Sequence, residues 1–192
     1  TSRNQKLLPY HEELKKAGAC FGASSGYERP MWFSRNGKKA EYEYSYNYQN
    51  WYPSAEFETK NTRENVGLFE LTPFSKYELK GQTAHDELQR ICTANIKNEI
   101  GKCTYTQMLN KDGGIETDLT VVKIAENNFR IITAAANRER DKFHIEKHLS
   151  KDIKLLDVTD DYCVLGLFGP KSISLMSDLS NDDYSNENFK FA

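Results

Sequence analysis

The chain contains 192 residues, and its 26 lysines and arginines nearly balance its 28 aspartates and glutamates, which gives a formal net charge of −2. That length suits one domain, or one domain with an arm. The charge balance argues against a nucleic-acid binder, which normally carries a basic excess, and no apolar run is long enough to span a bilayer. Four cysteines without Cys-x-x-Cys spacing indicate free thiols in a reducing compartment.

Residues 1–50 have a different pattern from the rest of the chain. A short helix is predicted over His11–Ala17, ended by Gly18. Alternating tyrosines then place four rings on one face of a strand or of an extended arm. These rings are Tyr42, Tyr44, Tyr46 and Tyr48. They either cover the domain's own core or pack against another domain, because so large an aromatic face would otherwise be exposed.

From Trp51 onward, helices and strands are intermixed with short connections. The stripe of Ala84, Leu88 and Ile91 marks the clearest helix, which Thr83 and Asp86 begin in the manner of a capping box. The predicted helices cover 54–65, 82–92, 137–149 (capped by Asn137) and 170–178, and the predicted strands cover 66–71, 76–79, 103–109, 115–124, 129–133, 154–158 and 163–168. A hairpin turn is predicted over 110–114. The sequence therefore predicts an α+β fold with a mainly antiparallel sheet and flanking helices.

The most informative residue for chemistry is Asp118. It follows two glycines that permit a tight turn, and it lies within the apolar strand predicted over 115–124. A carboxylate in such a strand either caps a neighbouring backbone group or has a raised pKa and handles protons. The pattern alone leaves both interpretations open.

Other possible sites are weaker. His144 and His148 have a spacing that suits a metal, but a third ligand and the zinc-protease order are missing, so no metal site is predicted. Cys92 has no histidine partner in the sequence that would support a nucleophile. The chain also contains no Gly-x-Gly-x-x-Gly sequence, and so no dinucleotide fingerprint of its own.

Several stretches together are similar to the folate-binding aminomethyltransferase family, which has the glycine-cleavage T-protein fold. They are Gly67–Phe74, the helix start at Gly81, Tyr105–Asn110, Gly113–Val121 and Phe129–Asp141. A further string, Gly26–Phe33, resembles the junction between the flavin domain and the C-terminal folate domain of dimethylglycine and sarcosine dehydrogenases.

This resemblance implies two regions. Residues 1–50 would be an arm or junction from a preceding FAD-dependent oxidoreductase domain, and residues 51–192 would be the N-terminal part of an incomplete folate-binding domain. The implied protein is a flavoprotein that oxidatively demethylates dimethylglycine or sarcosine. The one-carbon unit is then transferred to tetrahydrofolate, which gives 5,10-methylenetetrahydrofolate. This part alone is expected to be inactive.

The resemblance also implies roles for particular residues. Asp118 would be catalytic and assist proton movement beside the reacting folate nitrogens. Phe74, Tyr105 and Ile131 would wall the pterin and the linked aromatic ring, with Thr117 as a neighbour of Asp118. Two departures from the family pattern are Thr117, where T-proteins often have a second aspartate, and Ala134, where they often have an asparagine.

The implied ligands and partners follow from the same resemblance. They are tetrahydrofolate, an N-methyl amine and the FAD-binding domain of the same longer chain, with FAD itself held only in that domain. Neither nucleic acid nor a membrane is expected as a partner. The expected location is the cytoplasm of a bacterium or the mitochondrial matrix.

Two alternatives remain at this stage. One is a stand-alone T-protein-like aminomethyltransferase or folate-dependent demethylase that uses no flavin, which the string at 26–33 argues against. The other is a non-catalytic module of the same fold used for assembly or regulation.

Overall fold

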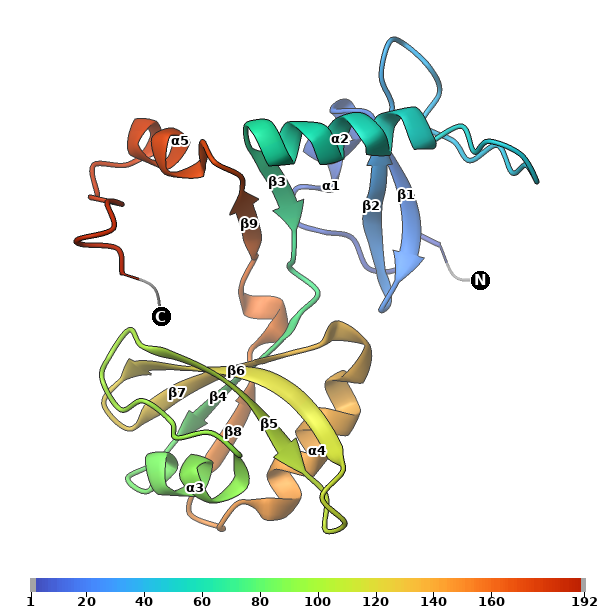
Figure 1. Cartoon of the computed structure of the whole chain (residues 1–192). Helices are drawn as coiled ribbons and strands as arrows, with labels where there is room; N and C mark the ends of the chain where they lie inside the picture. The colour runs from blue at the N-terminus through green and yellow to red at the C-terminus, as the bar shows by residue number, and fades with distance from the viewer. Residues whose placement is uncertain (1–2, 191–192) are drawn as a thin grey trace. The chain divides into compact units, whose positions relative to one another are not determined.

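The structure is a computed structural model that describes residues 3–190 (Figure 1). The chain forms two compact units. Unit 1 contains the described residues up to Thr72 and those from Cys163 onward, and unit 2 spans Pro73–Tyr162. None of the helices in the described part is long and apolar enough to cross a membrane.

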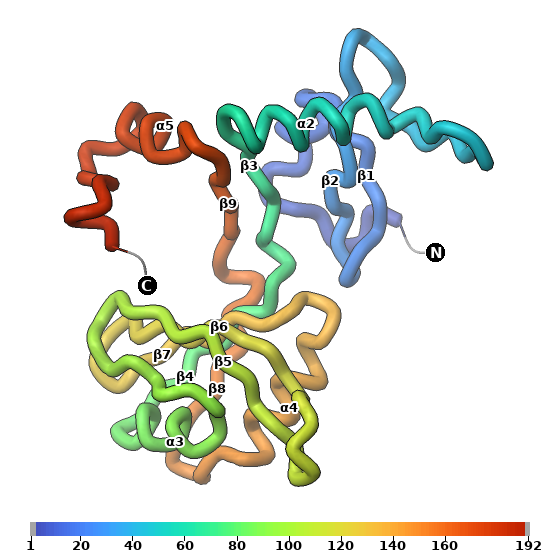
Figure 2. The backbone as a smooth tube through the Cα atoms, in the orientation of Figure 1, coloured from blue at the N-terminus to red at the C-terminus, as the bar shows by residue number. Residues whose placement is uncertain are grey.

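Unit 1 is built on two small antiparallel sheets. One is a hairpin of two strands that the sequence pattern did not predict, and the other pairs two strands that lie far apart in the chain (Figure 2). The elements of unit 1 are α1 (His11–Lys16), β1 (Ala19–Ser24), β2 (Tyr27–Phe33), α2 (Tyr52–Glu64), β3 (Gly67–Glu70), β9 (Leu165–Phe168) and α5 (Ser172–Leu179). The predicted helices over 11–17, 54–65 and 170–178 are confirmed to within a few residues.

The string Gly26–Phe33 has a structural role in this unit. Glu28 on β2 is buried, and its carboxylate accepts hydrogen bonds from Arg3 (2.7 Å) and from the backbone N–H of Asn4 (2.7 Å). These bonds lower the pKa of Glu28 to about 2. Arg29, the next residue, pairs with Glu70 on β3 at 3.2 Å. The string thus ties the hairpin to the segment before it and to the sheet after it.

The alternating tyrosines do not form a strand, which corrects one form of the prediction. The segment has no regular secondary structure, because no strand in the described part of the chain supplies ladder partners to it. Tyr42 and Tyr44 stack at 5.7 Å, as expected for an extended arm. Tyr44, Tyr46 and Tyr48 are 88%, 110% and 73% exposed, so these three rings do not cover the core of unit 1.

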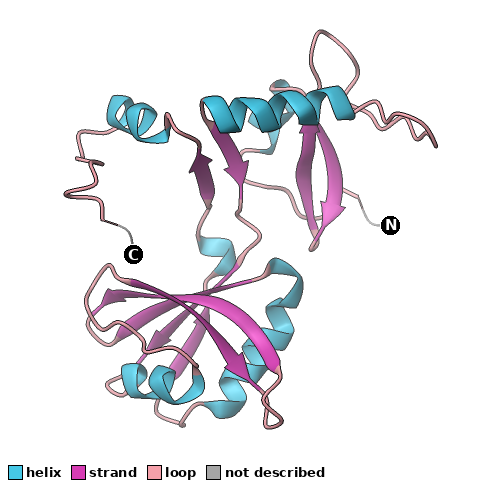
Figure 3. Cartoon of the chain, viewed as in Figure 1, coloured by secondary structure: helices cyan, strands magenta, loops and turns pink. Residues whose placement is uncertain are grey.

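Unit 2 is a five-stranded sheet with helices packed against it (Figure 3). Its elements are β4 (Ser75–Lys80), α3 (Ala84–Ile91), β5 (Cys103–Leu109), β6 (Ile115–Ala125), β7 (Asn128–Thr133), η1 (Ala135–Asn137), α4 (Arg138–His148), β8 (Lys154–Asp157) and η2 (Thr159–Asp161). The strand order is β5-β6-β7-β4-β8, and every neighbouring pair is antiparallel. The predicted α+β fold with a mainly antiparallel sheet and flanking helices is confirmed.

One face of this sheet carries the hydrophobic core. Side chains alternate along β5, β6 and β7, so that every second residue is buried. Helices α3 and α4 contribute Ala84, Leu88 and Ile145 to the cluster on that face. The sheet contributes Tyr77, Leu79, Met108, Leu119, Val121, Phe129 and Ile131. This arrangement fixes which residues of each strand remain available for a ligand.

The opposite face is covered over only part of its width. Near β4 and β7, Arg130 pairs with Glu78 at 2.6 Å and lies 4.1 Å from the ring centre of Tyr162. Lys76 and Glu78 on β4 are therefore buried although they point away from the main core. Over β5 and β6, and at the adjoining Ile132 of β7, the side chains are exposed or partly exposed, and we call this part the open face.

The two predicted helix caps are wrong in detail. Thr83 and Asn137 occupy the N-cap positions of α3 and α4, but neither side chain makes a capping hydrogen bond. Both residues have backbone angles near φ −100° and ψ +14°. An N-cap residue usually has extended backbone angles, which direct its side chain toward the N–H groups of the first helical turn.

Candidate active site on the open face

The open face carries a hydrogen-bonded acid and phenol. Tyr105 on β5 is 64% exposed, and its Oη donates to Asp118 Oδ2 on β6 at 2.7 Å. Asp118 is also exposed. The short distance is typical of a hydrogen bond to a carboxylate, so the two side chains form one polar unit that points to solvent.

The hairpin between β5 and β6 sets this geometry. Asn110 Oδ1 accepts hydrogen bonds from the backbone N–H groups of Asp112 (3.0 Å) and Gly114 (2.9 Å). Gly113 has a φ of +81°, which a glycine adopts without strain. The predicted turn is confirmed, and it places Gln107 opposite Asp118. Tyr105 is two residues before Gln107 on β5 and lies on the same face of the sheet. Its side chain therefore reaches Asp118 diagonally across the two strands.

Asp118 changes the pKa of its hydrogen-bond partner, Tyr105. The hydrogen bond from Tyr105 to Asp118 raises the pKa of the Tyr105 phenol, and a small loss of hydration acts in the same direction. Gln107 contributes a hydrogen bond that lowers the pKa of the phenol. The phenol therefore stays a donor to Asp118 over the physiological range.

Asp118 is exposed although it lies within the apolar strand predicted from the sequence. Strand β6 is apolar, but α3 and α4 cover only the face that carries Thr117, Leu119 and Val121. Asp118 falls on the other face, because side chains alternate along a strand.

Two predicted binding residues lie on the covered face. Ile131 is 0% exposed within the core, and Thr117 is 2% exposed. Neither side chain can wall a ligand that contacts Asp118, since the sheet lies between them. The neighbour of Ile131, Ile132, is partly exposed and lies on the open face opposite Thr120, which in turn is opposite Tyr105.

Gln107, Thr120 and Ile132 were not predicted from the sequence as residues of the site. These three side chains share the open face with Tyr105 and Asp118. The sequence does contain a pattern that indicates them, because a hairpin turn over 110–114 combined with strand alternation fixes which residues share a face. This pattern places Ile132, and not Ile131, on the face of Asp118.

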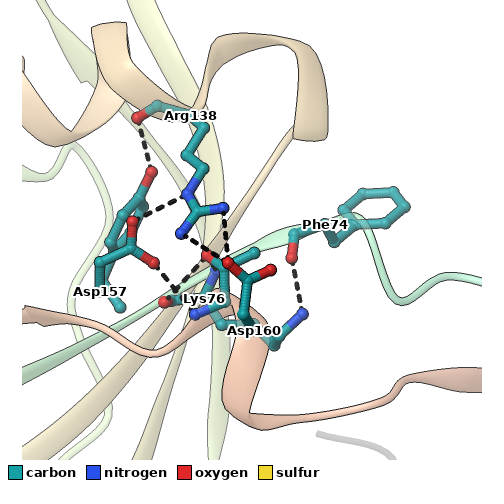
Figure 4. Close-up of polar contacts among 7 residues, drawn as sticks. Phe74, Lys76, Arg138, Asp157 and Asp160 are labelled. Atoms are coloured by element: carbon teal, nitrogen blue, oxygen red, sulfur yellow. Dashed lines mark hydrogen bonds and ion pairs between the residues drawn. The ribbon is translucent and has the colours of Figure 1, made fainter. Parts of the chain in front are cut away.

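Phe74 lies just before β4 and is 38% exposed. The Nζ of Lys76 donates to the Phe74 carbonyl oxygen at 2.8 Å, and the Phe74 ring points away from the nearby ion pairs of Arg138 (Figure 4). Arg138 joins Asp157 at 2.8 Å and Asp160 at 3.3 Å. These contacts hold the backbone at the start of β4 and leave the ring of Phe74 accessible.

The other candidate groups do not form a second centre of chemistry. The rings of His144 and His148 lie 4.6 Å apart and line a cavity of about 260 Å³ with Cys92. Burial raises the pKa of the Cys92 thiol to about 12, which makes it a poor nucleophile. Among residues 3–190 no group of three histidine, cysteine or acidic side chains could hold a metal ion.

The class of protein follows from these features. Unit 2 is an α+β sheet protein with helices on one face and an acid–phenol pair on the other. A solved structure, the glycine cleavage system aminomethyltransferase T from Bartonella henselae, superimposes with a TM-score of 0.73 at 25% sequence identity, covering 90% of this chain and 43% of that one.

The family follows from the sequence comparisons. The model of the GCVT N-terminal domain matches residues 10–192, so the chain belongs to the GCVT N-terminal domain family. The chain is 36% identical over 188 residues to a 4-methylaminobutanoate oxidase (formaldehyde-forming) of Paenarthrobacter nicotinovorans. It is 31% identical over 182 residues to the mitochondrial dimethylglycine dehydrogenase of Rattus norvegicus. The predicted family is confirmed.

The matches cover most of this chain but a small part of those relatives. The alignments take in 97% and 93% of this chain, and 23% and 21% of the oxidase and the dehydrogenase. The chain thus spans about a fifth of the length of these curated relatives. It is an aminomethyltransferase-like domain related to dimethylglycine dehydrogenases.

Proposed function

We propose that this chain is the tetrahydrofolate-binding part of a flavoprotein that oxidatively demethylates an N-methyl amine such as dimethylglycine or sarcosine. In this proposal Asp118 is the catalytic residue, and Tyr105, Gln107, Thr120 and Ile132 contact the folate beside it. We also propose that Phe74 contacts the folate. The observation that carries the proposal is the hydrogen bond of 2.7 Å between Tyr105 and Asp118 on an open sheet face.

The open face fits a reduced pterin in its chemistry. A pterin is a flat heterocycle with several N–H donors, and the carboxylate of Asp118 is an acceptor for such donors. Tyr105 and Ile132 offer apolar surface on either side of Thr120, to which both are register partners. A flat ring with polar edges is the ligand that such a strip of apolar and polar side chains suits.

The chemistry of the proposed reaction gives Asp118 a definite task. Tetrahydrofolate, when bound, supplies the nucleophilic nitrogens that take up the one-carbon unit as 5,10-methylenetetrahydrofolate. Asp118 accepts the proton that an attacking nitrogen releases when it bonds to an iminium carbon. Tyr105 holds one carboxylate oxygen, so that Asp118 keeps its orientation while the other oxygen takes the proton.

The flavin belongs to another part of the proposed protein. The FAD-binding domain would lie in the same longer chain, where it would oxidise the amine to the iminium. The structural role of Gly26–Phe33 in unit 1 is compatible with such a junction, and the exposed rings of Tyr44, Tyr46 and Tyr48 offer a surface for that domain. We expect such a protein in a bacterial cytoplasm or in the mitochondrial matrix.

A titration with tetrahydrofolate tests the proposal on the chain itself. Amide chemical shifts are followed residue by residue up to millimolar ligand. We expect shifts grouped at Tyr105, Asp118 and Ile132, and unchanged amides on unit 1. The matched control is Glu116→Gln, a half-buried acid two residues from Asp118, which should leave the titration as it is.

Two results would contradict the proposal. A folded spectrum that never moves would mean that this chain forms no folate site, and the alternative of a non-catalytic assembly module would then be favoured. Shifts confined to unit 1 would place the ligand away from Asp118 and remove its proposed role.

A further inference from the structure

Unit 1 contains a cavity that the proposed reaction does not use. It has a volume of about 560 Å³ and is formed by the end of β2, the segment that follows β2 and the first turns of α2. Its lining combines apolar side chains with a group of basic ones. The apolar residues are Trp32, Pro53 and Phe57, and the basic residues are Arg35, Lys38 and Lys39. A cavity of this size has room for a small organic molecule.

The basic residues are placed by a tight turn. The backbone N–H of Lys38 donates to the carbonyl oxygen of Arg35 at 3.2 Å, and the two residues between them, Asn36 and Gly37, have φ values of +57° and +71°. Two successive positive φ values are typical of a type I′ turn, which the Asn-Gly sequence favours. Ser34 Oγ also donates to the carbonyl oxygen of Lys38 at 2.6 Å. The turn therefore holds Arg35 and Lys38 next to each other in the lining.

The remainder of the lining is also held by hydrogen bonds. The Asn50 side chain accepts from the backbone N–H of Glu43 at 3.2 Å and donates to the carbonyl oxygen of Glu41 at 2.8 Å. Next to Asn50, the carbonyl oxygen of Trp51 accepts the backbone N–H of Ser54 at 3.1 Å, where α2 begins. The cavity is thus formed by the chain itself, and a ligand does not have to order it.

The positive charge of the lining is not neutralised within the described part of the chain. Three basic residues face one acidic residue, Glu43, which leaves an excess charge of +2. Arg35 stacks on the Phe57 ring, with its Cζ 3.1 Å from the ring centre, and its N–H donors make no hydrogen bond within residues 3–190. Burial raises the pKa of Glu58, which the charge of Arg35 opposes only in part, and the Glu58 carboxylate accepts the backbone N–H of Phe33 at 3.1 Å instead.

We propose that this cavity binds a small organic phosphate. A phosphate monoester carries a charge of about −1.5 to −2 at pH 7, which matches the excess charge of the lining, whereas one carboxylate would balance only half of it. The guanidinium of Arg35 offers paired N–H donors to phosphate oxygens, and Lys38 and Lys39 add ammonium charges. The organic part of the ligand contacts the apolar part of the lining. This site lies within unit 1 alone and does not rest on the proposed role of Asp118.

A titration of the full chain with phenyl phosphate tests the inference. Amide chemical shifts are followed up to millimolar ligand at constant ionic strength. We expect saturating shifts grouped at residues 34–39 and 53–57, with the amides of Tyr105 and Asp118 unchanged. Inorganic phosphate lacks the organic part and should bind more weakly, and phenol lacks the charge and should not saturate. Added salt should weaken the binding of phenyl phosphate, because it screens exposed charges.

Two double variants with the same change in charge separate this site from general electrostatics. Lys38→Gln with Lys39→Gln removes two exposed charges from the lining, and the affinity for phenyl phosphate should fall by about tenfold or more. Lys15→Gln with Lys16→Gln removes two exposed charges from α1, which does not line the cavity, and should leave the affinity nearly unchanged.

The inference is overturned if phenyl phosphate moves no amide of residues 34–39, or if both double variants bind it equally well. Equal affinity for inorganic phosphate would overturn the organic ligand, and tighter binding of a tetraglutamate peptide would assign the cavity to an acidic protein segment instead. None of these titrations contains folate. Their failure would therefore leave the proposal for the open face as it stands, and a failed folate titration would leave this one.

Discussion

The two faces of the five-stranded sheet of unit 2 differ although the same strands build both. On the covered face, α3 and α4 bury residues such as Ile131 completely. On the open face, the next residue along the strand, Ile132, is partly exposed and shares its surroundings with Tyr105 and Asp118. Neighbours in sequence thus have different surroundings, the core on one side and solvent on the other, because alternate side chains of a strand point in opposite directions.

This comparison changes what a conservative substitution is expected to do. A residue on the covered face should affect the free energy of unfolding and leave ligand contacts alone. A substitution on the open face should affect ligand contacts and leave the free energy of unfolding nearly unchanged.

The largest effect is expected for Asp118→Asn in the complete enzyme. Removing a general base typically lowers the rate by about 100- to 10,000-fold, and the amide keeps the size of the side chain. The rate of one-carbon transfer to tetrahydrofolate is measured together with the oxidation of the amine, which should continue. Glu116→Gln is the control, and equal rates in Asp118→Asn and wild type would remove the open face from the reaction.

The neighbouring isoleucines give the most direct test of the two faces. Ile131→Ala should lower the free energy of unfolding by about 2–5 kcal/mol, because it opens a cavity in the core. Ile132→Ala, which removes a partly exposed side chain, should cost about 1 kcal/mol and weaken tetrahydrofolate binding. Urea denaturation and ligand titration of both variants check this, and the comparison fails if the two stabilities fall equally.

A substitution of Glu78 tests the contribution to stability of the covered part of the face opposite the core, near β4 and β7. Hydrogen bonds from Lys80 and Arg130 lower the pKa of Glu78 to about 2, so its contribution to stability is complete above pH 4.5 and is lost as the pH falls toward 2. Glu78→Gln should cost about 2 kcal/mol at neutral pH and flatten the fall in stability in acid. Denaturation between pH 7 and pH 2 gives the measurement, with the exposed Glu99→Gln as control.

The smallest effect is expected for Tyr105→Phe. The substitution removes only the hydrogen bond to Asp118, which lies on an exposed surface where water can replace the phenol, so we expect roughly a fivefold loss of transfer rate at most. The free energy of unfolding should stay close to that of the wild type, because the side chain is exposed. A loss as large as that of Asp118→Asn would mean that Tyr105, rather than Asp118, handles the proton.

Local patterns were sufficient for most elements of unit 2. Alternation predicted the strand at 103–109 with its observed bounds, and the Asn-Lys-Asp-Gly-Gly sequence predicted the hairpin, because both signals are encoded within a few residues. The hairpin β1–β2 was missed, and one bond that holds it, from Arg3 to Glu28, joins residues 25 positions apart, which a local pattern does not reveal. The tyrosine alternation suggested a strand, but within residues 3–190 no strand pairs with that segment.

The sequence by itself determined the family, the sheet, and the presence of Asp118 and Tyr105 as polar side chains on adjoining strands. Only the tertiary structure decided which face α3 and α4 cover, and therefore that Ile131 belongs to the core while Ile132 borders the site. Alternation tells which residues share a face, but which face is buried depends on helices that return to the sheet from other parts of the chain.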